Sequence, residues 1–344
     1  MDGCRIAVIG ATGAVGSVFL SILEERSFPA TEVRLCASER SWGRKLTVLG
    51  KERTVEEATP ELLGEVDLVF VCAGSGISRE IGPLAVDNGA SVVDKSSAFR
   101  MDPDVPLVIP EINGDDLETH RGIVSVPNCS TAPLAMTLKP LMGVNSIERV
   151  VVSTYQSVSG TGAAAVEELR NQSASSLDNG PIEPSEYPHQ IAFNVLPHVE
   201  TFEDNGYTTE EMKMVNETRK ILHEPDLRIS ATCVRVPVMV GHSEAVHIDF
   251  EEPIGPGEVR EALSNVPGLK VVDDPAMNRY PMPVDAEGED DVFVGRIRQD
   301  VSNPCGVAMW LVTDNLRKGA ALNGIQIAEE MMSRGLVSTP ARRG

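Results

Sequence analysis

A cysteine stands where a strand gives way to a helix, the kind of position that can make a thiol reactive. Cys129 follows the apolar run 123–126 and precedes a helix expected over 132–142, with Pro133 in its opening turn. Backbone N–H groups and the dipole at a helix N-terminus stabilise a thiolate, and with the Asn128 amide they can hold an oxyanion. The pattern indicates a thiol nucleophile, although a cysteine buried beside a helix cap fits the position equally well.

A thiol nucleophile needs a proton-carrying partner, and the chain has six histidines, among which periodicity does not choose strongly. His242 follows Gly241 at a turn between two apolar strands, where a polar side chain can enter a cleft. His247 is out of phase with its apolar neighbours and is expected at the surface. Arg235 is the single charge in the strand 229–238, and such a charge is normally paired or at a site.

Two further cations are candidates for anion binding. Arg100 comes soon after the strand 91–94, on the edge of a parallel sheet where ligands bind. Lys213 shares a helix face with Glu210 and Glu217, just after a capping-box pattern. Taken alone, that face is typical of a solvated, salt-bridged helix surface.

A glycine loop near the N-terminus predicts a nucleotide site. The motif Gly10-Ala-Thr-Gly13-Ala-Val-Gly16 follows a strand and opens a helix. Glycines there allow a tight turn and close approach of a pyrophosphate to the helix N-terminus. An ordinary strand-to-helix turn is the alternative, and the GxxGxxG spacing is commoner in proteins that use NADP.

The end of the second strand bears on which nucleotide binds. An acid there selects the ribose hydroxyl of NAD, whereas Ser and Arg suit a 2′-phosphate. Ser38, Arg40 and Ser41 favour NADP, and Glu39 is the one residue that argues against it.

Composition narrows the class of protein. The chain has 344 residues and a formal net charge of -21, which argues against nucleic acid or an anionic membrane as a partner. No apolar run reaches the ~18 residues of a spanning helix, and the N-terminus resembles no targeting signal, so a cytoplasmic location is expected. The six cysteines form no CxxC pair and no metal-like spacing, so we expect neither disulfides nor a metal site.

The elements expected along the chain form two domains. Alternating strands and helices over 1–128 predict an α/β, Rossmann-type doubly wound parallel sheet, with a C-terminal helix over 316–334 packing back on it. Long β-branched runs over 129–315 predict an α+β domain with a mostly antiparallel sheet and helices on one face. The polar stretch 171–207 is expected to be a long surface loop.

In combination these segments resemble the aspartate-β-semialdehyde dehydrogenase family. The glycine loop, Asn128-Cys129-Ser130-Thr131, the stretch 155–160 (Tyr-Gln-Ser-Val-Ser-Gly), Glu210-Glu211-Met212-Lys213, and Arg235 with His242 occur in the family's order over essentially the whole chain. The resemblance implies reduction of L-aspartyl-4-phosphate by NADPH to L-aspartate 4-semialdehyde and phosphate. This step leads towards lysine (through diaminopimelate), threonine, methionine and isoleucine, and a homodimer or homotetramer is expected.

The resemblance also implies roles for single residues. Cys129 would accept the acyl group, His242 would be the general acid/base, and Gln156 would orient the substrate. The remaining substrate contacts would be Arg235 for the α-carboxylate, Glu210 for the α-ammonium, Arg100 and Lys213 for phosphate, and Asn128 for phosphate or the oxyanion. The cofactor would meet Thr12, Gly13, Ala14, Val15, Arg40, Ser41, Ser159, Gly160 and Asn315.

Three other functions are alternatives. N-acetylglutamyl-phosphate reductase would not need an ammonium-binding Glu210, and malonyl-CoA reductase would lack a pocket for α-amino and carboxylate groups. A non-catalytic NADP-binding homologue is the third, and the joint presence of Cys129, Gln156, Arg235 and His242 argues against it.

Overall fold

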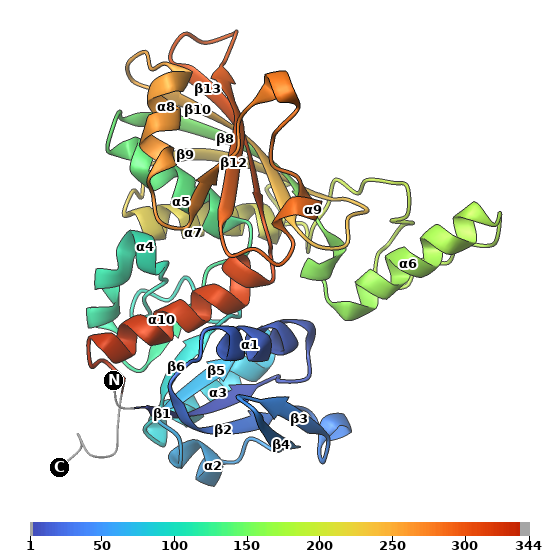
Figure 1. Cartoon of the computed structure of the whole chain (residues 1–344), viewed down its shortest axis with the longest axis vertical. Coiled ribbons are helices and arrows are strands. Elements are labelled where there is room, and N and C mark those ends of the chain that lie inside the picture. The colour runs from blue at the N-terminus through green and yellow to red at the C-terminus, as the bar shows by residue number, and fades with distance from the viewer. Residues whose placement is uncertain (1–2, 338–344) are drawn as a thin grey trace. The chain divides into compact units, whose positions relative to one another are not determined.

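The computed structural model describes residues 3–337, which divide into two units. The first unit comprises residues 3–128 and 320–337, and the second unit comprises residues 129–319 (Figure 1). Among residues 3–337, no helix is both long and apolar enough to cross a membrane.

A seven-stranded sheet forms the centre of the first unit, in the order β3-β4-β2-β1-β5-β6-β7. All neighbouring pairs are parallel except β3 and β4, which form an antiparallel hairpin. Its elements are β1 (Cys4–Ile9), α1 (Ala14–Glu25), β2 (Ala30–Cys36), η1 (Glu39–Ser41), β3 (Lys45–Val48), β4 (Lys51–Glu56), α2 (Pro60–Gly64), β5 (Leu68–Val71), α3 (Ser75–Asp87), β6 (Ser91–Asp94), α4 (Pro110–Asn113), η2 (Gly114–Thr119), β7 (Ile123–Ser125) and α10 (Leu322–Ser333).

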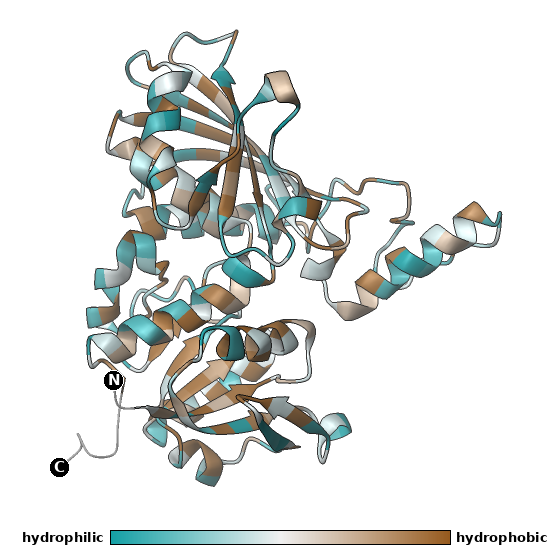
Figure 2. Cartoon of the chain, viewed as in Figure 1, coloured by the Kyte–Doolittle hydropathy of each residue, from teal (hydrophilic) through white to brown (hydrophobic). Residues whose placement is uncertain are grey.

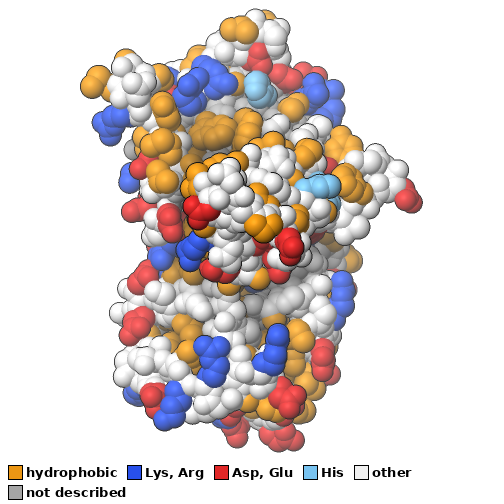
Figure 3. Space-filling model, turned by 90° about the vertical axis from the view of Figure 1, so that its right-hand side faces the viewer, with side chains coloured by type: hydrophobic (Ala, Val, Ile, Leu, Met, Phe, Trp, Pro, Cys, Tyr) orange, Lys and Arg blue, Asp and Glu red, His pale blue; other side chains and the backbone are white. Residues whose placement is uncertain are grey.

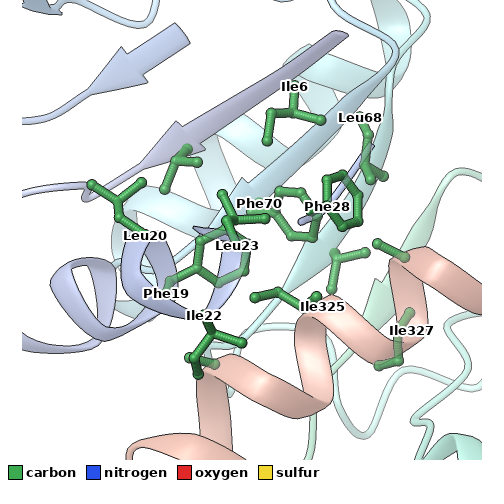
Figure 4. Close-up of a cluster of buried hydrophobic side chains, with 14 of the residues drawn as sticks. Ile6, Phe19, Leu20, Ile22, Leu23, Phe28, Leu68, Phe70, Ile325 and Ile327 are labelled. Atoms are coloured by element: carbon green, nitrogen blue, oxygen red, sulfur yellow. The ribbon is translucent and has the colours of Figure 1, made fainter. Parts of the chain in front are cut away.

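Apolar clusters lie on both faces of this sheet, as a doubly wound fold requires. On one face, Phe19 of α1 packs against Phe70 of β5 with ring centroids 4.5 Å apart. Ile325 of α10 and Phe28 belong to the same cluster (Figure 4). Each such buried side chain contributes roughly 1.5–3 kcal/mol. The C-terminal helix is therefore part of the core that supports the glycine loop.

The second unit has a six-stranded sheet in the order β11-β12-β13-β10-β8-β9. β8–β10, β10–β13 and β12–β13 are antiparallel, and β8–β9 and β11–β12 are parallel. Its elements are α5 (Thr131–Met142), β8 (Ile147–Gln156), η3 (Val158–Gly160), α6 (Ala163–Leu177), α7 (Thr209–Leu222), β9 (Arg228–Arg235), β10 (His242–Phe250), α8 (Pro256–Ser264), β11 (Leu269–Val271), η4 (Pro275–Met277), α9 (Pro283–Ala286), β12 (Val292–Gln299), β13 (Gly306–Thr313) and the π-helix η5 (Arg317–Ala321), whose last residues enter the first unit.

Helices α5, α7 and α8 pack together and against strands β9, β12 and β13 of this sheet. The strands carry alternating hydrophilic and hydrophobic residues (Figure 2), and in β10 the even-numbered residues from His242 to Phe250 are all buried. The predicted fold class, a Rossmann-type parallel sheet plus a mostly antiparallel α+β domain, is confirmed.

Three expectations about local structure were wrong. The predicted loop 171–207 begins inside α6, which continues to Leu177. The hairpin β3–β4 was missed because half of its residues are charged and only Val48 and Val55 are buried. Strand β12 was missed because its register shifts between Gly295 and Arg298, which interrupts the pattern.

Charged side chains of both signs intermingle on the molecular face in Figure 3. Anion binding must therefore depend on individual placed cations, since the formal net charge of the chain is -21.

Candidate active site

Three of the predicted site residues lie side by side at the ends of neighbouring strands. Gln156 ends β8 and pairs in register with Arg235, which ends the parallel strand β9. On the other side of β8, Ser243 of β10 lies opposite Tyr155, so the same register sets His242 beside Gln156. All three side chains are buried, with 1–6 % of their surface exposed. The sheet thus builds a row of an arginine, an amide and an imidazole, which we call the strand-end row.

The His242 ring is held by Ser157, in the turn that follows β8. Its Nδ1 accepts hydrogen bonds from the Ser157 N–H at 3.0 Å and lies 3.1 Å from the Ser157 hydroxyl. Its Nε2 is buried and has no hydrogen-bond partner within residues 3–337. Burial, and next the Arg235 guanidinium, lower the pKa of His242 to about 3, while Glu210 opposes the shift. The ring is therefore neutral at physiological pH.

The Arg235 guanidinium is hydrogen-bonded to the protein through one nitrogen and retains other donors that a ligand could use. Its Nη1 donates to the Ser157 carbonyl at 2.7 Å, and its guanidinium carbon lies 6.0 Å from the centre of the Tyr187 ring. Its Nε is buried without a partner in the described part of the chain. This leaves donors with the geometry for a carboxylate.

A chain of polar contacts links the strand-end row to helix α7. Gln156 donates through Nε2 to Glu210 at 2.9 Å, and Lys213 donates to Glu210 at 3.2 Å and to Glu200 at 2.5 Å. Glu210 and Glu217 are 3 % and 1 % exposed. The interpretation of this helix face as a solvated surface was therefore wrong, because the face packs inward on the sheet.

Cys129 lies two residues before the first helical residue of α5. The N-cap Ser130 makes no side-chain capping bond and the first turn of α5 holds no acidic side chain, which favours a negative charge at this helix end. Cys129 is partly exposed, whereas burial raises the pKa of Cys4, Cys36 and Cys72 to about 12 and that of Cys233 further. These four thiols are unsuited to act as nucleophiles, and Cys129 stands apart from them.

Gly319 packs directly against the backbone of Cys129. A β-carbon at Gly319 would lie 2.8 Å from Cβ and 3.1 Å from Cα of Cys129. Gly319 lies in η5, where its N–H reaches back five residues to the Asp314 carbonyl at 3.4 Å. Single π-helical turns often occur at functional sites.

We expect Gly319→Ala to lower kcat by about 10- to 100-fold, because the added methyl must displace Cys129 by several tenths of an ångström. Steady-state kinetics and the rate of Cys129 alkylation by iodoacetamide measure the effect. The matched control is Gly257→Ala in α8, where an added β-carbon meets nothing within 4 Å. Wild-type rates in Gly319→Ala would contradict a positioning role.

Asn315 connects the turn before β10 to the turn after β8. Its Oδ1 accepts hydrogen bonds from the Ser157 hydroxyl, the Ser159 hydroxyl and the Gly241 N–H at 3.0–3.1 Å, and its Nδ2 donates to Ser159 at 3.0 Å. The side chains of Asn315 and Ser159, both predicted to meet the cofactor, thus bond to each other inside the second unit.

The remaining predicted residues lie in the first unit. Gly10 has a φ of +83°, and a β-carbon on Gly16 would lie 2.2 Å from the Gly10 carbonyl oxygen, so both positions require glycine. Helix α1 starts after Gly13 with no side-chain cap and no acid in its first turn. That free helix N-terminus fits a pyrophosphate, with Thr12, Ala14 and Val15 around it.

Residues for the adenosine end and for phosphate are also found in this unit. Ser41 is buried and bonds to Thr12 across 3.2 Å, while Ser38, Glu39 and Arg40 are exposed beside it. A guanidinium and a hydroxyl near the glycine loop fit a 2′-phosphate. Arg100, 5 % exposed, donates to the Lys95 carbonyl at 2.7 Å, and Asn128 is 6 % exposed.

Sequence reasoning gave no role to Ser157, Gly319 or Glu200. Ser157 lies within a motif that was recognised, but nothing in the pattern shows that its N–H meets an imidazole 85 residues away. A glycine within a helical stretch was the signal for Gly319. Glu200 lies in an irregular segment and carries no signal.

Comparisons with known proteins agree with this arrangement. Residues 5–120 match the model of the semialdehyde dehydrogenase NAD binding domain, and residues 138–318 match that of the semialdehyde dehydrogenase dimerisation domain. The aspartate-semialdehyde dehydrogenase of Aquifex aeolicus is 50% identical over 339 residues, covering 97% of this chain and 100% of the relative.

Solved structures give the same result. Aspartate semialdehyde dehydrogenase II of Vibrio cholerae, complexed with ASA, has 42% identity and a TM-score of 0.94, covering 97% of this chain and 99% of that one. The Candida albicans enzyme with NADP has 27% identity and a TM-score of 0.75, covering 97% and 100%. With half of its residues identical to a full-length relative and both of its units matched, the chain belongs to the aspartate-semialdehyde dehydrogenase family.

Proposed function

We propose that the chain catalyses the NADPH-dependent reductive dephosphorylation of L-aspartyl-4-phosphate to L-aspartate 4-semialdehyde and phosphate. The observation that carries the proposal is the strand-end row, in which Gln156 separates a buried neutral His242 from a buried Arg235 whose Nε has no partner among residues 3–337. The relative of known structure that was solved with ASA supports the same substrate.

The charges of the site complement those of an aspartyl phosphate. The substrate carries a carboxylate, an ammonium and a phosphate. Arg235 suits the planar carboxylate through two parallel hydrogen bonds, and the buried Glu210 carboxylate suits the ammonium. Lys213, which bonds to two carboxylates, and Arg100 are the proposed phosphate ligands. Asn128 is proposed to assist the phosphate or the oxyanion.

The proposed chemistry uses Cys129 as a covalent carrier. Its sulfur attacks the acyl carbon, the carbon–oxygen bond to phosphate breaks, and phosphate leaves a thioester on Cys129. After reduction, the negatively charged oxygen reforms a carbonyl as the carbon–sulfur bond breaks, which releases the aldehyde and regenerates the thiolate. Gln156 is proposed to orient the acyl group, and His242 is the proposed acid/base group at that oxygen.

The family uses NADP, and the bound cofactor supplies the hydride for this reduction. We propose that the helix end at Gly13–Gly16 holds the pyrophosphate and that Arg40 and Ser41 hold the 2′-phosphate. Ser159, Gly160 and Asn315 are the proposed contacts from the second unit. The two units are thus proposed as an NADP-binding domain and a catalytic domain.

The three rival functions are less well supported. An N-acetylglutamyl-phosphate or malonyl-CoA reductase has no use for a buried carboxylate linked to Gln156, and a non-catalytic homologue has no use for a partly exposed thiol at an uncapped helix end. Full-length relatives with the aspartate-semialdehyde name also favour the main proposal.

The reverse reaction tests the proposal directly. Aspartate semialdehyde, phosphate and NADP are expected to give NADPH, measured by its absorbance, and arsenate is expected to replace phosphate. The matched control replaces the substrate with succinate semialdehyde, which lacks the amino group and is expected to react at least 100-fold more slowly. No NADPH from aspartate semialdehyde would contradict the proposal.

We further propose that the protein is a cytoplasmic homodimer or homotetramer assembled through the second unit. This rests on the match to a dimerisation domain. On the sheet face away from α5 and α7, Tyr155 is 38 % exposed and contacts Trp310 at a ring distance of 5.2 Å. Light scattering at two protein concentrations measures the size.

A further inference from the structure

The Ser157 N–H fixes which nitrogen of His242 carries the proton. A backbone N–H can only donate, and it points at Nδ1 from 3.0 Å. Nδ1 must therefore be the unprotonated nitrogen, and in a neutral ring the proton then lies on Nε2. A proton on Nδ1 would set two donors against each other inside the protein.

Asn315 keeps that donor in place. Its single carbonyl oxygen accepts bonds from the Ser157 hydroxyl and from the Gly241 N–H, so it ties together the turns that carry Ser157 and His242. Gly241 has a φ of +94°, which directs the chain into β10 at His242. The imidazole thus sits between two turns that one side chain joins.

The Nε2–H in turn lacks an acceptor. Nε2 is buried and unpartnered among residues 3–337. The point where a β-carbon on Gly160 would lie is 3.2 Å from Nε2 and 3.1 Å from Nη1 of Arg235, so Gly160 leaves space that both donors border. A buried donor without an acceptor is costly unless a ligand supplies one. An oxygen atom of a bound ligand could supply that acceptor.

We propose that Ser157 and Asn315 are positioning residues that hold His242 as the Nε2–H tautomer, so that the ring donates a hydrogen bond to the substrate's reacting oxygen. This rests on the proposed function and replaces proton transfer by His242 with hydrogen-bond donation at the same oxygen. When hydride adds to the thioester carbon, the C=O electron pair moves onto oxygen, and Nε2–H stabilises that charge. The proton stays on nitrogen, and the pair returns to form the aldehyde as the thiolate leaves.

The surroundings of the ring keep it neutral. The residues beside His242 on the two adjacent strands are uncharged: Gln156 on β8 and Thr313 on β13. From β9, Arg235 disfavours an imidazolium, and from α7, Glu210 favours one. On its own strand, burial raises the pKa of Glu244 well above the ordinary value, which disfavours a negative charge there. Burial and Arg235 together outweigh Glu210.

Nitrogen-15 NMR of enzyme labelled at its histidines reports which ring nitrogen carries the proton, without any turnover. The His242 signals are identified as those missing from the spectrum of the His242→Gln variant. At pH 7 we expect a proton on Nε2 and none on Nδ1. A proton on Nδ1, or on both nitrogens, would overturn the assignment. A chain with the Nε2–H form that yields no NADPH in the reverse assay would contradict the proposed function and leave the tautomer standing.

Ser157→Ala tests the positioning role. Loss of the hydroxyl removes the Ser157 bond to Asn315 and the hydroxyl contact with Nδ1 of His242, so we expect a second tautomer in the spectrum and a kcat about 10-fold lower, with an unchanged KM for NADPH. Ser157→Thr keeps a hydroxyl and should recover most of the rate. The control is Ser153→Ala in β8, where the serine is only partly buried and alternates with the buried residues Val152 and Thr154. A kcat within twofold of wild type, or a slow variant with the wild-type tautomer, would refute the role.

Discussion

Cys129→Ser is expected to lower kcat by about 10³-fold or more while NADP binding stays unchanged. A hydroxyl at this position is a far weaker nucleophile at neutral pH, and no base in the strand-end row can activate it, because the His242 ring is neutral with its acceptor nitrogen occupied. Steady-state rates in both directions and NADP titration by calorimetry measure the two quantities.

The matched control is Cys305→Ser, which alters the other partly exposed thiol of the second unit. Cys305 precedes β13 and is expected to be replaceable without loss of rate. Equal loss of activity in both variants, or persistence of activity in Cys129→Ser, would show that the nucleophile lies elsewhere.

Arg235→Lys is expected to lower kcat/KM for aspartate semialdehyde by about 30- to 3,000-fold, equivalent to roughly 2–5 kcal/mol for a buried charged contact. Lysine keeps the charge but cannot donate to the Ser157 carbonyl and to a carboxylate with the same planar geometry. The loss should fall mainly on the semialdehyde, with a smaller effect on KM for NADP.

Strand β9 supplies the control for this change. Arg228 begins the same strand and is exposed, where it pairs with Glu148. Arg228→Lys preserves a surface ion pair worth at most ~1 kcal/mol, so its kinetics should match those of the wild type. If Arg235→Lys behaves like Arg228→Lys, the carboxylate is bound by another residue.

Much of the fold could be predicted because burial leaves a periodic signal. β5, with all four residues buried, reads as a central parallel strand from its apolar run alone. The same logic fails for the hairpin of the edge strand β3 with β4, where half of the side chains are charged and only two are buried. It fails again for α7, whose acidic face looks solvated in sequence. That face is buried, and its Glu210 is paired with Gln156 and Lys213.

The site could be predicted in its residue types but not in its contacts. The resemblance drew attention to Gln156, Arg235 and His242, yet only strand register shows that they are neighbours across three strands. Asn315 was assigned to the cofactor from the family resemblance alone. That its oxygen joins two turns depends on hydrogen bonds between residues 74 to 158 positions apart, which leave no local pattern.

Under the proposed function, we expect the strand-end row to set the length of substrate that fits. Neighbouring strands lie about 4.8 Å apart, so Arg235 and His242, two strands apart, begin from backbone positions separated by roughly 10 Å. Sheet hydrogen bonds fix that spacing, and side-chain rearrangement cannot change it. A substrate gripped by its carboxylate at one end of the row thus presents its reacting carbonyl at a set distance. A homologue longer by one methylene is expected to overshoot the imidazole, which would place the discrimination in the backbone of the sheet.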